Sequence, residues 1–162
     1  MKKIVFILGI VTAFAAVGCL KNNDDDYKPC TPKTVESELP AMTKFATDST
    51  ISTTTDATGL LYQVIEPGTG ATPTATSSVV AKYVGRFMDG KGFDSSYVRS
   101  PQGASFRLNE VIAGWTIGIP KIKAGGKIKL IIPSSLAYGC GSPYGFLNNQ
   151  PLYFYVELVS VN

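Results

Sequence analysis

Hydrophobic and polar residues alternate over most of the chain after residue 59, in short runs that are typical of strands. The clearest run is 127–132, where Lys and Ile alternate, the pattern of a half-buried strand. One segment, 115–122, instead favours one or two turns of helix, since Pro120 interrupts a longer one. The predicted strands cover 60–65, 78–88, 105–108, 127–132 and 152–161.

Turn residues separate these runs and indicate how they connect. Pro67-Gly68 ends the first run, Asp89-Gly90 is a strong hairpin signal after the second, and Gly125-Gly126 precedes the fourth. Several strands and one short helix predict an α+β domain, in which a twisted antiparallel sheet of about five strands wraps around the helix.

The segment before this domain is different in character. Residues 27–58 are rich in Thr, Ser, Pro and Asp, and 49–58 predicts a loop or a weakly specified edge strand. A short helix is predicted at 36–45, because Leu39, Met42 and Phe45 fall roughly on one face. We interpret the segment as a linker that leads into the domain.

The N-terminus has the pattern of a secretory signal. Lys2 and Lys3 precede an apolar run, 4–17, which ends at Gly18-Cys19. The run is too short to span a bilayer of ~30 Å, which needs roughly 20 residues. The alternative is a buried core helix, but nothing downstream has the pattern of its partner, and residues 21–26 are polar.

Ala16-Val17-Gly18-Cys19 resembles a bacterial lipobox, with Ala16 where leucine is usual. The resemblance implies that Cys19 is lipidated and becomes the first residue of the mature protein. The acidic stretch that follows, 20–26, resembles the tether of surface-exported lipoproteins, although a solvated spacer is an equal alternative. The predicted organisation is a signal peptide at 1–18, lipidated Cys19 with a polar tether and linker at 19–58, and a domain at 59–162. The predicted location is the bacterial cell envelope, on the periplasmic or cell-surface face of the outer membrane.

The composition excludes several kinds of chemistry and does not by itself point to a particular one. The net charge of +3 gives no reason to expect a nucleic-acid partner. None of the 162 residues is histidine, which removes the commonest general base, the commonest metal ligand and every Ser-His or Cys-His pair. We therefore expect neither a metal nor a cofactor. With no heptad repeat in the sequence, we expect a monomer.

The other two cysteines, Cys30 and Cys140, have two interpretations. In an oxidising compartment they most simply form one disulfide, which would close a loop of more than 100 residues. The alternative is two free thiols.

Five sequence blocks, in order between residues 59 and 162, resemble the signature of the FK506-binding-protein (FKBP) family of peptidyl-prolyl isomerases. The blocks are Tyr83-Val84-Gly85-Arg86-Phe87 with Asp89 to Ser96, Val111-Ile112-Ala113-Gly114-Trp115, Ile122 to Lys127, Ile132-Pro133 with Ala137-Tyr138-Gly139, and Val156-Glu157-Leu158. One such block would be weak evidence for the family, but five blocks in order and at the family's spacing are highly specific to it.

The resemblance implies a pocket for an X-Pro segment. The residues at the family's catalytic positions are Tyr83, Phe93, Asp94, Trp115, Tyr138 and Phe154, and those at substrate-binding positions are Phe106, Val111, Ile112 and Phe146. Trp115 would form the floor, while the Ile112 N–H and the Tyr138 hydroxyl would hold carbonyl groups. Taken singly, aromatic residues such as Phe93 and Phe154 are more often core than site, so the joint pattern carries this inference.

The family implies rotation about X-Pro bonds of exported polypeptides, and inhibition by macrolides of the FK506 and rapamycin type. Two departures from the family pattern bear on that expectation. Leu147-Asn148 replaces a proline pair in the loop that shapes the pocket mouth, and Ala104 stands near a position that is aromatic in some members. The alternative functions are therefore a non-catalytic proline-binding or chaperone module, and a purely structural surface lipoprotein.

Overall fold

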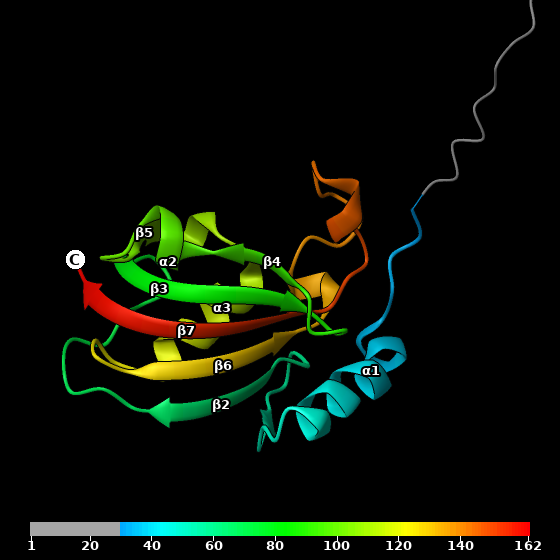
Figure 1. The fold of residues 1–162 in the computed structure, drawn as a ribbon, viewed down its shortest axis with the longest axis horizontal. Helices are drawn as coiled ribbons and strands as arrows, with labels where there is room; N and C mark the ends of the chain where they lie inside the picture. The colour runs from blue at the N-terminus through cyan, green and yellow to red at the C-terminus, as the bar shows by residue number, and fades with distance from the viewer. Residues whose placement is uncertain (1–29) are drawn as a thin grey trace, which may run out of the picture.

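The computed structural model describes residues 30–162, so the predicted signal peptide and Cys19 lie outside it. A single antiparallel sheet of seven strands forms the body of the protein (Figure 1). The strands are β1 (Thr54–Thr55), β2 (Leu61–Glu66), β3 (Ser78–Phe87), β4 (Gly92–Ser95), β5 (Ala104–Arg107), β6 (Lys127–Ile132) and β7 (Leu152–Val161). The α-helices are α1 (Val35–Asp48), α2 (Ser96–Arg99) and α3 (Ala113–Gly118), and the 3₁₀ turns are η1 (Leu108–Glu110), η2 (Ile119–Lys121), η3 (Ser134–Leu136) and η4 (Gly145–Leu147).

The two longest strands, β3 and β7, pair in the middle of the sheet. The strand order is β1-β2-β6-β7-β3-β4, and β5 also pairs with β3. The β3–β7 ladder runs from Val79 opposite Val161 to Phe87 opposite Leu152, with a shift of register after Val80. The last strand of the chain therefore lies beside β3, and residues far apart in sequence share one face.

The inner face of the sheet packs on α3, which lies behind the strands in Figure 1. Alternate residues of β3, β6 and β7 point to this side and form the main core with Trp115 and Ile119. The helix lies close to β6 because Gly114 faces it: a Cβ there would come within 2.4 Å of Ile132. The buried strand residues of this core are Val79, Ala81, Tyr83, Ile128, Leu130, Ile132, Leu152, Phe154, Val156 and Leu158.

A second, smaller core lies on the outer face, where α1 covers part of the sheet. Met42 and Phe45 of α1 are buried there with Leu61 and Ile131, and the Phe45 ring centroid lies 5.1 Å from that of Tyr153. The predicted helix at 36–45 is confirmed and extends at both ends. The linker interpretation is too simple for this part of the chain, since a docked helix buries apolar side chains that a linker would expose.

The five predicted strands are found, each within one residue of its predicted ends. The structure adds two short strands that were not predicted, β1 and β4. β4 follows the Asp89-Gly90 turn and pairs with β3, which completes the hairpin that this turn predicts. The predicted helix begins two residues earlier, at Ala113, and gives way to the 3₁₀ turn η2 at Ile119, next to Pro120.

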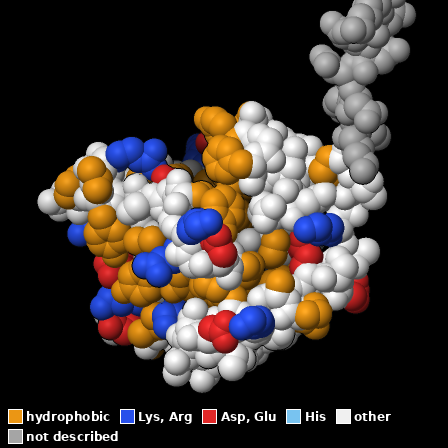
Figure 2. Space-filling view, turned by 45° about the vertical axis from the view of Figure 1, so that its right-hand side comes forward, with side chains coloured by type: hydrophobic (Ala, Val, Ile, Leu, Met, Phe, Trp, Pro, Cys, Tyr) orange, Lys and Arg blue, Asp and Glu red, His pale blue; other side chains and the backbone are white. Residues whose placement is uncertain are grey.

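Charged and hydrophobic side chains are mixed on the outer surface (Figure 2). Lys82 of β3 lies opposite Glu157 of β7, and Val84 lies opposite Tyr155 on the same face. Figure 2 shows blue and red side chains scattered among the orange ones on this face. Within residues 30–162, no helix has the length and apolar character needed to cross a bilayer.

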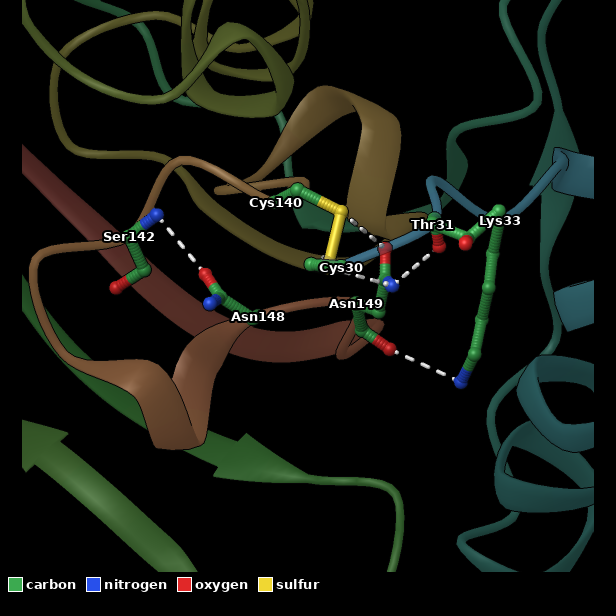
Figure 3. Close-up of a disulfide and its surroundings, with 7 residues drawn as sticks. All are labelled: Cys30, Thr31, Lys33, Cys140, Ser142, Asn148 and Asn149. Carbon is green, nitrogen blue, oxygen red and sulfur yellow. Dashed lines mark hydrogen bonds between the residues drawn. A yellow bond between two sulfur atoms is a disulfide. The ribbon is translucent and has the colours of Figure 1, made fainter. Parts of the chain in front are cut away.

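A disulfide ties the start of the described chain to the loop before β7. Cys30 and Cys140 are bridged, at a sequence separation of 110 residues and with 5.6 Å between their Cα atoms. This is one of the two interpretations that the sequence left open. Next to the bridge, the Asn149 side chain donates to the Thr31 carbonyl at 2.6 Å, and Lys33 Nζ donates to the Asn149 carbonyl at 3.1 Å (Figure 3).

Reducing this bridge should destabilise the protein, because the open chain has more conformations in the unfolded state. The chain-entropy model gives a loss of up to roughly 4–5 kcal/mol for a loop of this size. Urea unfolding with and without reductant measures the loss. A Cys30→Ser, Cys140→Ser variant should have the stability of the reduced protein and should not respond to reductant. Equal stability of the native protein in both conditions would show that the bridge contributes nothing.

Candidate functional site

A cavity of about 510 Å³ opens on the inner face of the sheet, over the N-terminal end of α3. Strands β3, β4, β5 and β7 supply some of its walls, and the segments before α3 and after η3 supply the others. Nine of the ten predicted pocket residues line it, and Phe146 is the exception. The lining residues are Tyr83, Phe93, Asp94, Phe106, Glu110, Val111, Ile112, Ala113, Trp115, Ala137, Tyr138 and Phe154.

The floor of the cavity is the indole of Trp115, with three aromatic rings standing on it. The ring centroids of Tyr83, Phe106 and Phe154 lie 5.2, 5.3 and 5.3 Å from that of Trp115. The interplanar angles are 84°, 74° and 87°, so each contact is edge-to-face, a geometry that aromatic rings prefer. The rings fix one another and leave an apolar recess above the indole.

A glycine in β3 lets two of the aromatic walls meet. Phe93 and Phe154 pack edge-to-face with centroids 5.6 Å apart, directly over Gly85. A Cβ at Gly85 would lie 2.8 Å from Phe93 and 2.9 Å from Phe154. Because these contacts are shorter than carbon atoms tolerate, the Tyr-x-Gly pattern of β3 is a packing requirement of the pocket.

The polar side of the cavity is built around Asp94, at the end of the hairpin. The Tyr83 hydroxyl donates to Asp94 Oδ2 at 2.7 Å, and the Ser95 N–H donates to Oδ1 at 2.8 Å. Arg99 of α2 forms an ion pair with the same carboxylate and donates to the Tyr83 hydroxyl at 3.3 Å. Burial, reinforced by Asp94, raises the pKa of Tyr83 to about 12, so its hydroxyl stays protonated at neutral pH.

Tyr138 and Ala137 also line the cavity. They follow η3 in a segment without strands, between β6 and β7. Burial raises the pKa of Tyr138, and the nearby Asp94 charge adds to this effect. The phenol therefore remains a neutral hydrogen-bond donor at neutral pH.

The structure adds lining residues that were not predicted individually: Glu110, Ala113 and Ala137. Arg99 was also missed, although it lies only five residues after Asp94 and its charge could have suggested a partner for that carboxylate. Ala113 and Ala137 stood inside the quoted motifs. An alanine carries no chemical signal of its own, so only the fold identifies it as part of a wall.

Phe146 is the predicted site residue that the cavity does not include. It is 61% exposed and lies beside the pocket wall, with its ring centroid 6.4 Å from that of Phe87, which in turn packs on Phe93. The neighbouring Leu147 is buried in the main core instead. In this loop the Leu147 side chain thus points inward, whereas the Phe146 side chain lies at the surface.

Tyr83 and Asp94 hydrogen-bond to each other in the cavity, whereas the buried Trp115 Nε1 has no hydrogen-bond partner within residues 30–162. Among the described residues, no group of three or more Cys, Asp or Glu side chains could hold a metal ion. Of the described residues that line the cavity, Asp94 and Glu110 are the carboxylates. The arrangement suits an apolar ring bound in a recess, with hydrogen-bond donors at its edge.

Comparison with known proteins agrees with this site. Residues 70–159 match the family model described as FKBP-type peptidyl-prolyl cis-trans isomerase. The chain is 49% identical over 118 residues to "FKBP-type peptidyl-prolyl cis-trans isomerase FkpA" of Escherichia coli K12, covering 73% of this chain and 43% of that protein. It is 42% identical over 106 residues to "Peptidyl-prolyl cis-trans isomerase Mip" of Coxiella burnetii, covering 65% of this chain and 46% of the relative.

Solved structures give the same result for the fold. The crystal structure of FkpA from Escherichia coli superposes with a TM-score of 0.69 at 45% identity, over 78% of this chain and 60% of that one. A peptidyl-prolyl cis-trans isomerase from Pseudomonas syringae superposes with a TM-score of 0.64 at 36% identity, over 82% of this chain and 98% of that one. The chain spans less than half the length of the curated relatives described above. The family match covers more than half of this chain, and the chain belongs to the FKBP-type peptidyl-prolyl cis-trans isomerase family.

Proposed function

We propose that the protein is an active peptidyl-prolyl cis-trans isomerase that rotates X-Pro bonds in exported polypeptides. The observation that carries the proposal is the cavity over Trp115, lined by aromatic rings, in which nine of the ten predicted pocket residues meet. Family membership supports it, and so do the printed activities of the relatives.

The reaction fits a site with neither histidine nor a cluster of metal ligands. Rotation about an X-Pro bond has a barrier of ~18–20 kcal/mol, because the C–N bond has partial double-bond character. No covalent bond between heavy atoms breaks during this rotation, so the reaction needs no nucleophile and no cofactor. In the twisted transition state the amide loses resonance and its carbonyl becomes less charge-separated. An apolar recess therefore stabilises the twisted amide more than the planar one.

The residues have distinct proposed roles. Trp115 forms the floor beneath the proline ring, and Tyr83, Phe93 and Phe154 form walls around it, with Phe106, Val111 and Ile112 contacting the substrate beside it. The Ile112 N–H and the Tyr138 hydroxyl hold substrate carbonyl groups. Asp94, fixed by Tyr83 and Arg99, orients the rotating carbonyl. The macrolide inhibitors of the family would occupy the same recess.

A binding module without turnover is the second candidate function, and the loop before β7 favours it. Phe146, expected at the pocket rim, is exposed beside Phe87, and the proline pair of the family is absent. Such a module would bind an X-Pro segment, as a chaperone does, without catalysing rotation about its X-Pro bond. A purely structural lipoprotein is less well supported, because it leaves the aromatic recess unexplained.

We also propose that the protein works as an exported, lipid-anchored monomer. The apolar run before Cys19 and the resemblance of residues 16–19 to a lipobox support this proposal, and both lie outside the described residues. The disulfide between Cys30 and Cys140 agrees with an oxidising compartment. The clients of the protein would be exported polypeptides that carry X-Pro bonds.

Activity is tested by prolyl cis/trans exchange of a short X-Pro peptide, followed by NMR. The protein should accelerate exchange far beyond the uncatalysed time of roughly 10–100 s, and a macrolide of the family should abolish the effect. Asp94→Val should lower turnover about tenfold without unfolding the protein, because one orienting group is lost. The matched control is Asp48→Val, at the exposed end of α1, which should retain full turnover.

Peptide binding with exchange at the uncatalysed rate would replace the isomerase proposal with the binding module. Full turnover in Asp94→Val would show that Asp94 has no orienting role.

The anchor is tested by fractionation of cells that produce the protein. Cys19→Ala should move the protein from the membrane fraction to the soluble fraction, because the acyl chains that hold it are lost. Cys30→Ser controls for the loss of a cysteine elsewhere in the chain and should remain in the membrane fraction. Unchanged fractionation of Cys19→Ala would contradict lipidation at this residue.

A further inference from the structure

Glu38 is a buried acidic residue for which the proposed reaction has no use. It lies on α1, before the part of the chain that matches the family, and only 3% of its surface is exposed. Its Oε2 accepts a hydrogen bond from the Ser134 N–H at 2.8 Å, across 96 residues of sequence. Its Oε1 finds no hydrogen-bond donor within residues 30–162.

A buried carboxylate with one unpaired oxygen is costly to the folded state. An apolar residue of similar size at position 38 would avoid this cost, so stability alone does not account for the carboxylate. Its one hydrogen bond is of the charge-assisted kind, which is short and directional. That bond ends on the first residue of η3, in the segment that carries Tyr138.

The Ser134 backbone is the centre of the turn around Tyr138. Its carbonyl accepts the N–H of Ala137 at 3.0 Å and the N–H of Gly139 at 2.8 Å. Tyr138 lies between these two residues, so one carbonyl holds the backbone on both sides of it. Glu38 in turn holds the preceding peptide group through the Ser134 N–H, on the other side of the same Cα atom.

The same loop is fastened to the N-terminal segment at two further places. Cys140, two residues after Tyr138, is bridged to Cys30. Asn149 donates from its backbone N–H to the Gly139 carbonyl at 2.7 Å, and from its side chain to the Thr31 carbonyl at 2.6 Å (Figure 3). Residues 30–38 therefore hold the segment after β6 from Ser134 through Asn149.

We propose that Glu38 is a positioning residue for the pocket: its carboxylate fixes the backbone of Ser134 and thereby the Tyr138 hydroxyl at the edge of the cavity. The proposal rests on the proposed isomerase function, in which Tyr138 holds a substrate carbonyl. It assigns a role in the reaction to a helix outside the family match. Residues 30–38 are then part of the working site as well as a connection to it.

The test compares Glu38→Ala with Glu38→Gln, each with and without Tyr138→Phe. Glu38→Ala should lower catalysed prolyl exchange about tenfold, and Glu38→Gln should restore most of it, since an amide oxygen still accepts from Ser134. In the Tyr138→Phe background, Glu38→Ala should have no further effect, because Glu38 acts through the hydroxyl already removed. Met42→Ala, a buried α1 residue that packs on the sheet, is the control for loss of stability. It should keep the turnover of the native protein.

Amide hydrogen exchange separates this proposal from the isomerase function. Protection of the Ala137 and Gly139 amides should fall in Glu38→Ala and persist in Glu38→Gln and Met42→Ala, whether or not the protein catalyses isomerisation. Unchanged protection in Glu38→Ala would overturn the proposal. So would equal loss of turnover in Met42→Ala, or an undiminished effect of Glu38→Ala in the Tyr138→Phe background. If the native protein catalyses no exchange, the isomerase function fails, and the protection pattern alone decides whether Glu38 holds the turn.

Discussion

The packing of three aromatic rings on the Trp115 indole is the interaction on which the site depends. Tyr83 comes from β3, Phe106 from β5 and Phe154 from β7, so the three rings meet only when the central strands pair in register. A shift of one residue along β3 or β7 would turn its ring to the outer face of the sheet. The fold and the recess are thus specified by the same contacts. The pocket is accordingly built mainly on strands and a helix, and one of its sides is a loop, the segment around Tyr138.

That one side, the Tyr138 segment, depends on a different set of contacts. It lacks strand hydrogen bonds, and its backbone is held by the Ser134 peptide group, by the Cys30–Cys140 bridge and by Asn149. Asn148 accepts from the Ser142 N–H at 2.9 Å within the same loop. The loop is thus held by side-chain hydrogen bonds and a bridge. The N-terminal segment supplies half of these contacts, which joins it physically to the pocket.

Alternation along the chain was sufficient to predict five of the strands, because buried and less buried residues alternate along much of their length, most clearly in β3. β1 escaped prediction because a two-residue strand is too short to show a period, and β4 because it has only one large apolar side chain, Phe93. Most of the pocket residues came from motif blocks, and the structure brings nine of the ten predicted ones together. Arg99 and Glu38 were missed for another reason. Each acts through a partner, Asp94 or Ser134, that folding places beside it, and Glu38 lies 96 residues from its partner. The exposure of Phe146 could not be predicted either, because only the fold decides whether Phe146 or its neighbour Leu147 is buried in the core.

The central claim is that the proline ring of a substrate enters the recess above Trp115. The chain has a single tryptophan, so its fluorescence reports on the floor of the pocket without interference from other indoles. The most direct measurement is a titration of the protein with an X-Pro peptide and with the same peptide carrying alanine in place of proline. The account predicts a saturable change in emission with the proline peptide, and none with the alanine peptide over the same concentrations. Catalysed exchange without any change in Trp115 emission, or an equal change with the alanine peptide, would contradict it.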